Sequence, residues 1–263
     1  MVHLEHVDST NTWLAQRARD GAEGPRAVYC DYQSDGRGRL ARVWRAPAGS
    51  SLLCSALLEA PATAVAPQWV VIAAAVATCD ALALLSGRRP TLKWPNDVLY
   101  DERKVAGLLA EVVVIDRADR HALGTRPRGT LGRDPVRQAS AKVVVGLGLN
   151  LGAVDPEYAG ATTVLDATGT ALDPATVLRA YLDALSERRA ALDSASGRTT
   201  LRAHYLEDLA TIDRRVRVEL VGDVVRGRAL GVDDDGALIV DTGDERRTFA
   251  AGDVVHLRGE DSQ

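Results

Sequence analysis

The stretch from Trp69 to Leu85 is the most apolar part of this 263-residue chain. Asp80 is its only charged residue, and Pro67 and Gly87 stand where a first-turn proline and a C-terminal glycine mark the two ends of a helix. The stretch is slightly too short for a comfortable membrane span. We therefore expect an alanine-rich helix over 67–85, buried in the core of a large domain.

Further apolar patterns predict strands and helices on both sides of this segment. Four apolar runs predict strands, at 27–33, 51–58, 104–115 and 142–151. Capping residues and apolar periodicity predict three other helices, at about 9–21, 173–193 and 199–209. Residues 116–141 are rich in Arg, Gly, Pro, Thr and Ser and have almost no apolar pattern. We interpret 116–141 as a flexible insertion between two strands.

The apolar period changes to two from about Arg214 onward. Short alternating segments separated by glycine-containing turns predict strands at 216–220, 224–230, 237–240, 247–249 and 254–257. This pattern is typical of a small all-β barrel of roughly 45 residues, too small to carry much chemistry of its own. The sequence thus indicates an α+β protein with two domains, 1–213 and 214–263.

Composition limits the classes of function. The formal net charge of −4 argues against a general nucleic-acid-binding or membrane-surface protein, because such proteins carry a basic surface. No secretory signal opens the chain, and Cys30, Cys54 and Cys79 are spaced neither as a disulfide framework nor as a zinc site. We therefore expect buried thiols, a cytoplasmic protein, and only a local site for anions.

Residues 33–44 combine glycines, arginines and an indole in one short loop, which we call the glycine-arginine loop. Gly36 and Gly38 allow the backbone to approach a ligand closely. The guanidinium forks of Arg37, Arg39 and Arg42 suit carboxylate and phosphate oxygens. We expect a loop that folds over an anion and is mobile when empty, since its like charges repel. A solvated basic loop or an arm that touches RNA is the alternative.

Lysine and asparagine are unusually scarce. Only three of the 32 basic residues are lysines, and there are only three asparagines, so each is a candidate for work that Arg or Asp cannot do. The residues are Lys93, Lys104 and Lys142, and Asn11, Asn96 and Asn150. Residual compositional drift is the alternative explanation, and it suits Lys142.

Most of these residues fall inside short polar motifs. Ser9-Thr10-Asn11 either cap a helix or hydrogen-bond a neutral ligand. Lys93-Trp94-Pro95-Asn96-Asp97 is either an ordinary turn or a strand end whose side chains face a pocket. Lys104 is flanked by apolar residues and is costly to desolvate unless an anion meets it. Gly146 and Gly148, before Asn150, permit close backbone approach or mark a bulge.

Taken in order, these motifs make the chain resemble the biotin protein ligase (biotin–[acetyl-CoA-carboxylase] ligase) family. The resemblance covers nearly the whole chain apart from 116–141. It implies a catalytic domain like that of class II aminoacyl-tRNA synthetases, with a mixed, largely antiparallel sheet and helices, and an SH3-like C-terminal domain. It also implies two reactions in one pocket. The biotin carboxylate attacks the α-phosphate of MgATP to give biotinyl-5′-AMP and pyrophosphate, and the ε-amine of a carrier-protein lysine then attacks the mixed anhydride and AMP leaves.

The resemblance also implies roles for individual residues. Lys104 and Arg39 would be catalytic, with Lys104 stabilising charge during adenylation. The biotin site would comprise Ser9, Thr10, Asn11, Gln33, Gly36, Arg37, Gly38, Arg39 and Lys104. The ATP and adenylate site would comprise Arg37, Arg39, Arg42, Trp44, Lys93, Asn96, Asp97, Lys104 and Asn150, with Trp44 packed on adenine. No dedicated metal site is implied, because Mg²⁺ arrives with ATP, near Asp97.

Ala41 is the main departure from the family pattern, which usually has glycine there, and it puts tight closure of the loop in question. The ligase motifs begin at Ser9, so we expect no DNA-binding domain in front of them. The expected partner is a biotin carboxyl carrier domain, and the expected state is a monomer or weak homodimer. The alternatives are a lipoate or octanoate ligase or transferase, and a non-catalytic nucleotide- or RNA-binding module.

Overall fold

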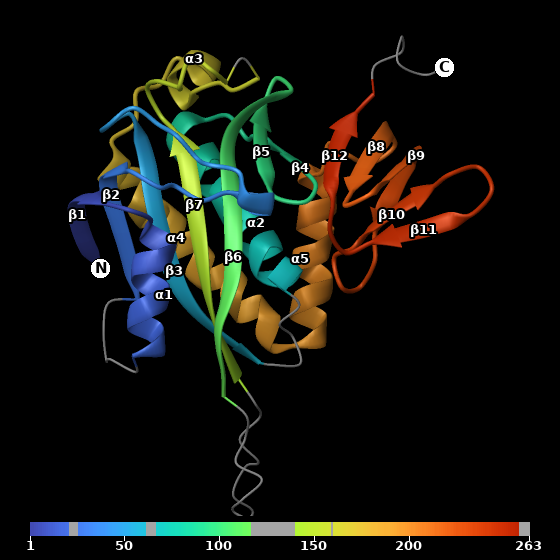
Figure 1. Cartoon of the computed structure of the whole chain (residues 1–263), viewed down its shortest axis with the longest axis horizontal. Helices are drawn as coiled ribbons and strands as arrows, with labels where there is room; N and C mark the ends of the chain where they lie inside the picture. The colour runs from blue at the N-terminus through green and yellow to red at the C-terminus, as the bar shows by residue number, and fades with distance from the viewer. Residues whose placement is uncertain (21–25, 62–66, 117–139, 159, 258–263) are drawn as a thin grey trace, which may run out of the picture.

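The computed structural model describes residues 1–20, 26–61, 67–116, 140–158 and 160–257 (Figure 1). A seven-stranded sheet forms the larger domain, in the order β1-β2-β3-β7-β6-β5-β4, and only β1 and β2 pair in parallel. The strands are β1 (Val2–Val7), β2 (Ala27–Gln33), β3 (Ser51–Pro61), β4 (Thr91–Lys93), β5 (Asp97–Tyr100), β6 (Arg103–Asp116) and β7 (Ser140–Asn150). The expected mixed, largely antiparallel sheet is confirmed.

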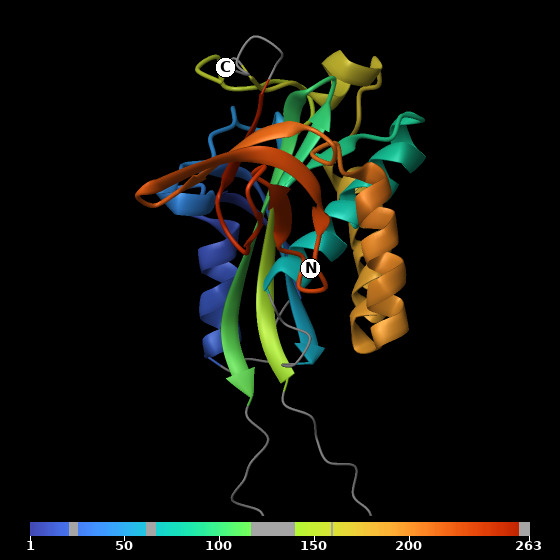
Figure 2. The same ribbon diagram turned by 90° about the vertical axis from the view of Figure 1, so that its right-hand side faces the viewer.

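Helices cover both faces of this sheet (Figure 2). On one face lies α1 (Thr10–Arg19), whose Leu14 and Ala15 pack with Val28 and Val144. The other face carries α2 (Pro67–Ser86), α4 (Pro174–Ala190) and α5 (Ala195–Asp208). Short helical turns complete the domain: η1 (Arg39–Ala41), α3 (Val164–Thr168) and η3 (Ala191–Asp193). The face with a single helix leaves room for a pocket beside α1.

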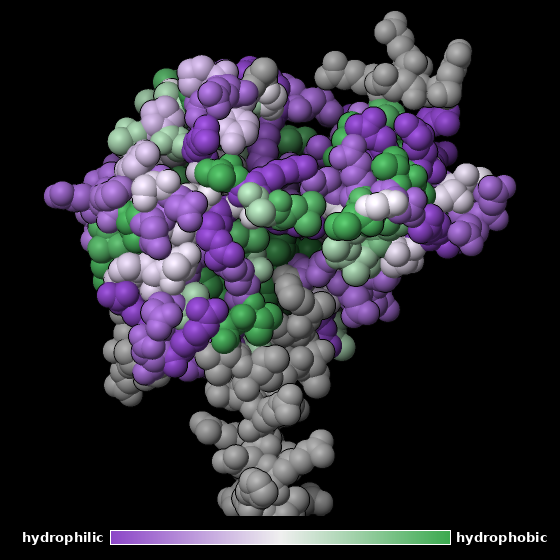
Figure 3. Space-filling model, in the orientation of Figure 1, coloured by the Kyte–Doolittle hydropathy of each residue, from purple (hydrophilic) through white to green (hydrophobic). Residues whose placement is uncertain are grey.

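The most apolar segment is the central core helix, as predicted. Helix α2 spans Pro67–Ser86, and residues such as Val70, Ala73 and Val76 have no measurable exposure. It is long and apolar enough to pass a test for a membrane span, but 67% of the tested window is buried inside the protein. On the face shown in Figure 3, hydrophobic residues lie in separate patches among hydrophilic ones. The apolar character of α2 therefore reflects burial in the domain core.

The predicted boundaries of other elements need small corrections. Helix α5 begins at Ala195, four residues before the expected start, because the Ser194 side chain accepts a hydrogen bond from the Gly197 N–H and caps it. The expected insertion is also too wide, since β6 reaches Asp116 and β7 begins at Ser140, where the two strands still pair. Residues 117–139 lie outside the described part of the chain.

The C-terminal domain is a five-stranded antiparallel sheet in the order β11-β10-β9-β8-β12. Its strands are β8 (Arg215–Leu220), β9 (Asp223–Val232), β10 (Leu238–Asp241), β11 (Arg246–Phe249) and β12 (Asp253–His256), close to the predicted ranges. Two indoles of the larger domain donate to backbone carbonyls here, Trp69 to Asp234 and Trp94 to Gly236, each at 3.1 Å. These bonds fix the small sheet against α2 and β4, at the right of Figure 1.

All three cysteines are buried and unpaired, as expected. Burial raises the pKa of the Cys30 thiol to about 12, and burial raises the pKa of Cys54 and Cys79 as well. Thiols in this state are protonated and unreactive at neutral pH.

Candidate active site

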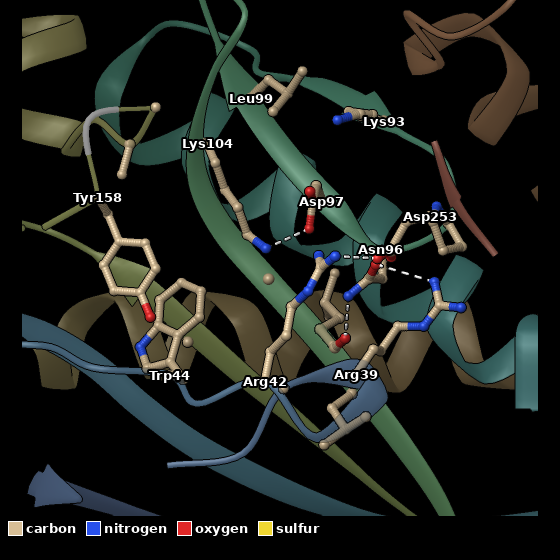
Figure 4. Close-up of a pocket in the computed structure, with 18 of the residues that line it drawn as sticks. Arg39, Arg42, Trp44, Lys93, Asn96, Asp97, Leu99, Lys104, Tyr158 and Asp253 are labelled. Carbon is tan, nitrogen blue, oxygen red and sulfur yellow. Dashed lines mark hydrogen bonds and ion pairs between the residues drawn. The ribbon is translucent and has the colours of Figure 1, made fainter. Parts of the chain in front are cut away.

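A pocket of about 770 Å³ opens on the α1 face of the large sheet, between the glycine-arginine loop and β12 (Figure 4). Seven lysine and arginine residues line it, against five aspartate and glutamate residues. The protein as a whole has a net charge of −4, so this pocket is a local exception of positive charge. It meets the expectation of a confined anion site.

Nearly all residues singled out in the sequence line this one pocket. They are Ser9, Thr10, Asn11, Gln33, Arg37, Gly38, Arg39, Arg42, Trp44, Lys93, Asn96, Asp97, Lys104 and Asn150. Of the residues assigned to the binding sites, Gly36 is the exception. It is buried and does not line the pocket, and its carbonyl accepts a hydrogen bond from the Trp44 N–H at 2.8 Å. A Cβ at Gly36 would stand 2.3 Å from the Trp44 carbonyl oxygen, so glycine is needed there for close pairing of the backbone.

The polar end of the pocket is built at the start of α1. Ser9 occupies the N-cap position, yet its side chain makes no capping hydrogen bond. Thr10 instead donates through both its N–H and its hydroxyl to the Gln33 side-chain oxygen, at 2.8 and 3.0 Å. Asn11 accepts a 2.6 Å bond from the Ser55 hydroxyl on β3. Capping therefore does not account for these residues, whose uncharged polar side chains lie together at this end of the pocket.

Gly107 on β6 and Gly146 and Gly148 on β7 form the floor of the pocket, against which the side chains of Trp44 and Asn11 pack. A Cβ at Gly148 would lie 2.5 Å from Cε2 of Trp44, and a Cβ at Gly146 would lie 2.3 Å from Oδ1 of Asn11. The Trp44 indole Nε1 is buried and has no hydrogen-bond partner within the described residues. The strand glycines thus provide the close approach that the sequence allowed, with Trp44 lying flat on the sheet.

The glycine-arginine loop takes an unusual backbone path over this floor. Leu40 and Ala41 adopt positive φ angles of 52° and 58°, in the left-handed region that favours glycine. Ala41 is therefore tolerated in the position where the family pattern has glycine, at a cost in backbone energy of about 1 kcal/mol or more. The Tyr158 hydroxyl donates to the Val43 carbonyl at 2.9 Å and holds the far end of the loop.

Acidic side chains already pair with the principal cations of the pocket. Lys104 Nζ lies 2.5 Å from Asp97, as Figure 4 shows, and Arg37 lies 3.0 Å from Glu111. Arg42 pairs with Asp253 of β12. The repulsion among the loop arginines, from which a mobile loop was expected, is thus offset by carboxylates from two strands, Glu111 of β6 and Asp253 of β12.

Arg39 differs from its neighbours because its contact is neutral. Its guanidinium donates to the Asn96 side-chain oxygen at 3.4 Å, and no carboxylate lies within ion-pair distance of it in the described residues. Burial lowers the pKa of Arg39, while Asp253 and Asp97 act in the opposite direction. An arginine with this environment stays protonated and gains more than its neighbours from an incoming anion.

The backbone around Lys104 is fixed on both sides. Its N–H donates to the Gly160 carbonyl at 2.9 Å, and its carbonyl accepts from the Thr162 N–H at 2.8 Å. Asn150 donates to the Thr162 carbonyl at 3.3 Å, and Asn96 to the Leu108 carbonyl at 2.8 Å. These two asparagines therefore anchor neighbouring backbone as well as facing the pocket. The lysine side chain projects from a rigid base, as precise charge placement requires.

Sequence reasoning missed several residues of the site. Asp253 and His256 of the small C-terminal sheet line the pocket, although this domain was expected to carry little chemistry. Glu111 and Ser55 reach the polar end through hydrogen bonds to Asn11. Glu111 and Ser55 lie in the predicted strands 104–115 and 51–58, and Asp253 begins β12, but no local pattern marks any of them as a site residue. Only contacts across the fold identify them.

His256 closes the edge of the pocket beside Lys93. Its Nε2 lies 3.1 Å from the Thr211 hydroxyl, and its Nδ1 lies 3.6 Å from Glu102. Burial lowers the pKa of His256, and Lys93 and Arg214 lower it further, against the opposite effect of Glu102. The imidazole is therefore neutral at pH 7 and serves as a hydrogen-bonding wall of the pocket.

The described residues contain no cluster of three or more His, Cys, Asp or Glu side chains that could hold a metal ion. Asp97 is a pocket carboxylate that lies beside Lys104 and is partly exposed. A divalent cation that came with a polyphosphate would find an oxygen ligand there.

Comparisons with known proteins agree with this architecture. Residues 4–126 match the family model "Biotin/lipoate A/B protein ligase family", and residues 211–257 match "Biotin protein ligase C terminal domain". The fold is similar to that of the biotin protein ligase from Aquifex aeolicus in complex with biotin and ATP, with a TM-score of 0.75 and 24% identity. That alignment covers 98% of this chain and 99% of the other.

Sequence relatives carry the comparison further. The chain is 36% identical to the biotin–[acetyl-CoA-carboxylase] ligase of Mycobacterium tuberculosis, over 97% of this chain and 88% of that protein. It is 32% identical to the enzyme of the same name from Paracoccus denitrificans, over 95% of this chain and 98% of that protein. With identity at this level over nearly all of both chains, and with both domains matched, the protein belongs to the biotin protein ligase family.

Proposed function

We propose that this protein uses MgATP to activate biotin as biotinyl-5′-AMP and then transfers the biotin to one lysine of a biotin carboxyl carrier domain. The observation that carries this proposal is the two-ended pocket. A neutral polar cluster at one end suits the ureido head of biotin, and a concentration of arginine and lysine at the other suits a carboxylate and a triphosphate.

The first reaction brings together two anions that repel each other. Arg37, Arg39 and Arg42 supply charges that do not titrate, and Lys104 lies between the loop and β5, where the carboxylate and α-phosphate would meet. Lys104 would exchange Asp97 for the substrate oxygens and stabilise the charge of the transition state. A preorganised contact of this kind is worth about 3–4 kcal/mol.

The polar end would hold biotin through Ser9, Thr10, Asn11 and Gln33. Their uncharged polar side chains line one end of the pocket and would suit a ligand head without net charge. Gly36 and Gly38 would let the loop backbone approach the same ligand. Trp44 lies flat on the glycine floor and offers an indole face against which adenine can pack. Lys93, Asn96 and Asn150 would contact the nucleotide.

In the second reaction the ε-amine of the carrier lysine attacks the acyl carbon of the mixed anhydride, the acyl–oxygen bond breaks, and AMP leaves. Asp97 would accept the proton of this amine once Lys104 has moved to the phosphate, and the same carboxylate would supply an oxygen ligand for the Mg²⁺ of the nucleotide. A closed glycine-arginine loop would keep water from hydrolysing the anhydride.

Lipoate attachment is the nearest rival function, and one family model spans both activities. Support for biotin comes from the match of residues 211–257 to a C-terminal domain model described for biotin protein ligases. Biotin-dependent exchange between ATP and pyrophosphate, absent when lipoate replaces biotin, is the expected result. Exchange with lipoate alone would refute the choice of biotin.

Lys104→Ala tests the proposed mechanism. The change should lower the rate of biotinyl-AMP formation by about 10²- to 10³-fold, in line with the loss of one such contact. Lys142→Ala, on β7 and outside the pocket, is the matched control and should retain full activity. Normal labelling of a carrier domain by Lys104→Ala would show that the role assigned to Lys104 is wrong.

We further propose that the enzyme works in the cytoplasm, as a monomer or weak homodimer, without binding DNA. The net charge of −4 supports the absence of DNA binding, because a DNA-binding protein carries a basic surface. Light scattering of the purified protein, with and without duplex DNA, tests the state and the absence of DNA binding together.

A further inference from the structure

We propose that Glu111 is a positioning residue that ties the biotin-head end of the pocket to the glycine-arginine loop. Glu111 lies on β6 and its carboxylate accepts hydrogen bonds from two residues that belong to different elements of the pocket. One is Asn11 at the start of α1, and the other is Arg37 in the loop. The inference rests on the function proposed above.

The contact with Asn11 fixes the orientation of its amide. Asn11 Nδ2 donates to Glu111 Oε2 at 2.9 Å and to the Leu109 carbonyl at 3.3 Å, while its Oδ1 accepts from Ser55 at 2.6 Å. Asn11 is almost completely buried, with 4% exposure. The hydrogen bonds assign oxygen and nitrogen of the amide without ambiguity, so Glu111 determines which group Asn11 can offer to a ligand.

The contact with Arg37 holds the start of the loop. Arg37 Nη1 lies 3.0 Å from Glu111 Oε1 and 3.2 Å from Oε2, so one donor is shared between both carboxylate oxygens. The two side chains are 46% and 28% exposed, so water reaches the pair; Arg37 lines the pocket, and Glu111 lies behind it. A pair of this exposure stabilises only modestly, enough to favour one position of the loop without fixing it.

Glu111 therefore couples the binding of a ligand at Asn11 to the position of Arg37 in the glycine-arginine loop. A ligand that binds Asn11 changes the hydrogen bonding of the same carboxylate that holds Arg37. Arg37 is the first arginine of the loop. Glu111 touches neither reacting atom in this arrangement. Its effect on the reaction passes through Asn11 and Arg37.

Two substitutions separate the two contacts. Glu111→Gln can keep its single side-chain oxygen at the position of Oε2, which preserves the bond from Asn11. Its amide group then replaces Oε1 and faces the Arg37 donor, so the negative charge and the 3.0 Å contact are lost and only the 3.2 Å hydrogen bond to Arg37 can remain. Glu111→Ala removes both contacts. Glu59→Gln, whose partner Arg26 forms an exposed pair at 3.4 Å far from the pocket, is the matched control.

The first readout is trypsin cleavage after Arg37 in the full-length protein without ligands. Both Glu111 variants should be cut about 3- to 5-fold faster than the unaltered protein, because that factor matches the loss of one such ion pair. The second readout is the Kd for biotin by calorimetry. Glu111→Gln should bind biotin within about twofold of the unaltered protein, whereas Glu111→Ala should bind about tenfold more weakly, as expected when a buried Asn11 donor loses its acceptor.

Cleavage at an unchanged rate in both variants would overturn the tether to the loop. Equal biotin affinity of the Gln and Ala variants would overturn the link to Asn11. Because the cleavage assay uses no ligand, it judges the tether even if the unaltered protein fails to bind biotin, a result that would instead refute the proposed function. Melting curves for all variants identify any general loss of folding.

Discussion

Arg42 of the glycine-arginine loop forms an ion pair with Asp253, the first residue of β12, across 211 residues of sequence. It is the one hydrogen bond between residues 36–44 and the C-terminal sheet in the described part of the chain. Only 18% of the Asp253 side chain is exposed, so this carboxylate is a pocket wall contributed by the small domain. Asp253 supplies Arg42 with the negative charge that a phosphate group would otherwise provide.

Asp253→Asn should therefore strengthen the binding of ATP. The substitution removes the internal competitor for Arg42, and an ion pair of this kind is worth about 0.2–1 kcal/mol, which corresponds to about a 1.5- to 5-fold lower Kd. Equilibrium binding of ATP with biotin present measures it. Asp223→Asn, which alters an exposed pair with Arg247 within the same sheet, should leave the Kd unchanged. Weaker ATP binding by Asp253→Asn would contradict the competition.

Gly148→Ala should impair nucleotide binding through Trp44. The added methyl group would lie 2.5 Å from Cε2 of the indole, so the Trp44 side chain must move away from β7. Forced repacking of this kind costs about 1–3 kcal/mol, and we expect KM for ATP to rise by about tenfold. Steady-state kinetics and tryptophan fluorescence measure the two effects. Gly152→Ala has open space around its Cβ and should behave as the unaltered protein. A tryptophan fluorescence spectrum identical to that of the unaltered protein would refute the prediction.

Stability should fall as the pH drops below about 6.5, the ordinary pKa of histidine. The pKa of His256 is lower in the folded state than in the unfolded chain, chiefly through burial and then through Lys93 and Arg214, with Glu102 opposing. The unfolded state therefore binds the proton first, and the contribution is complete above pH 6.5 and lost as the pH falls through the folded-state pKa. Melting curves from pH 8 to pH 5 measure it. His256→Gln should flatten this part of the profile, and an unchanged profile would exclude His256 as its source.

Asp208→Asn should destabilise the helical layer. The Asp208 side chain is 9% exposed and accepts two hydrogen bonds from Arg89, at 2.7 and 2.6 Å. Removing a buried charge partner costs about 3–5 kcal/mol, and because Arg89 is 40% exposed we expect about 2 kcal/mol in urea unfolding. Asp213→Asn, in an exposed pair with Arg228, is the control with a far smaller effect. A loss as small as that of the control would show that the pair is dispensable.

Most elements of the fold could be predicted because they depend on local patterns. The bracketing proline and glycine gave the bounds of α2 to within one residue, and the period of two located the strands of the C-terminal sheet. Strand ends were harder. Pairing of Asp116 with Ser140 extends two strands past the end of their apolar pattern, since backbone hydrogen bonds continue where side chains no longer indicate burial.

The candidate site divides in the same way. Sequence alone determined which residue types could handle a carboxylate and a phosphate, because glycine, arginine and scarce lysine or asparagine residues have distinctive chemistry at short spacing. Tertiary structure decided which acid faces each base. Glu111 lies 74 residues from Arg37 in the chain and Asp253 lies 211 residues from Arg42, so no local pattern could pair them. Strand order in the large sheet brings Glu111 of β6 next to Arg37, and docking of the small sheet brings Asp253 of β12 next to Arg42.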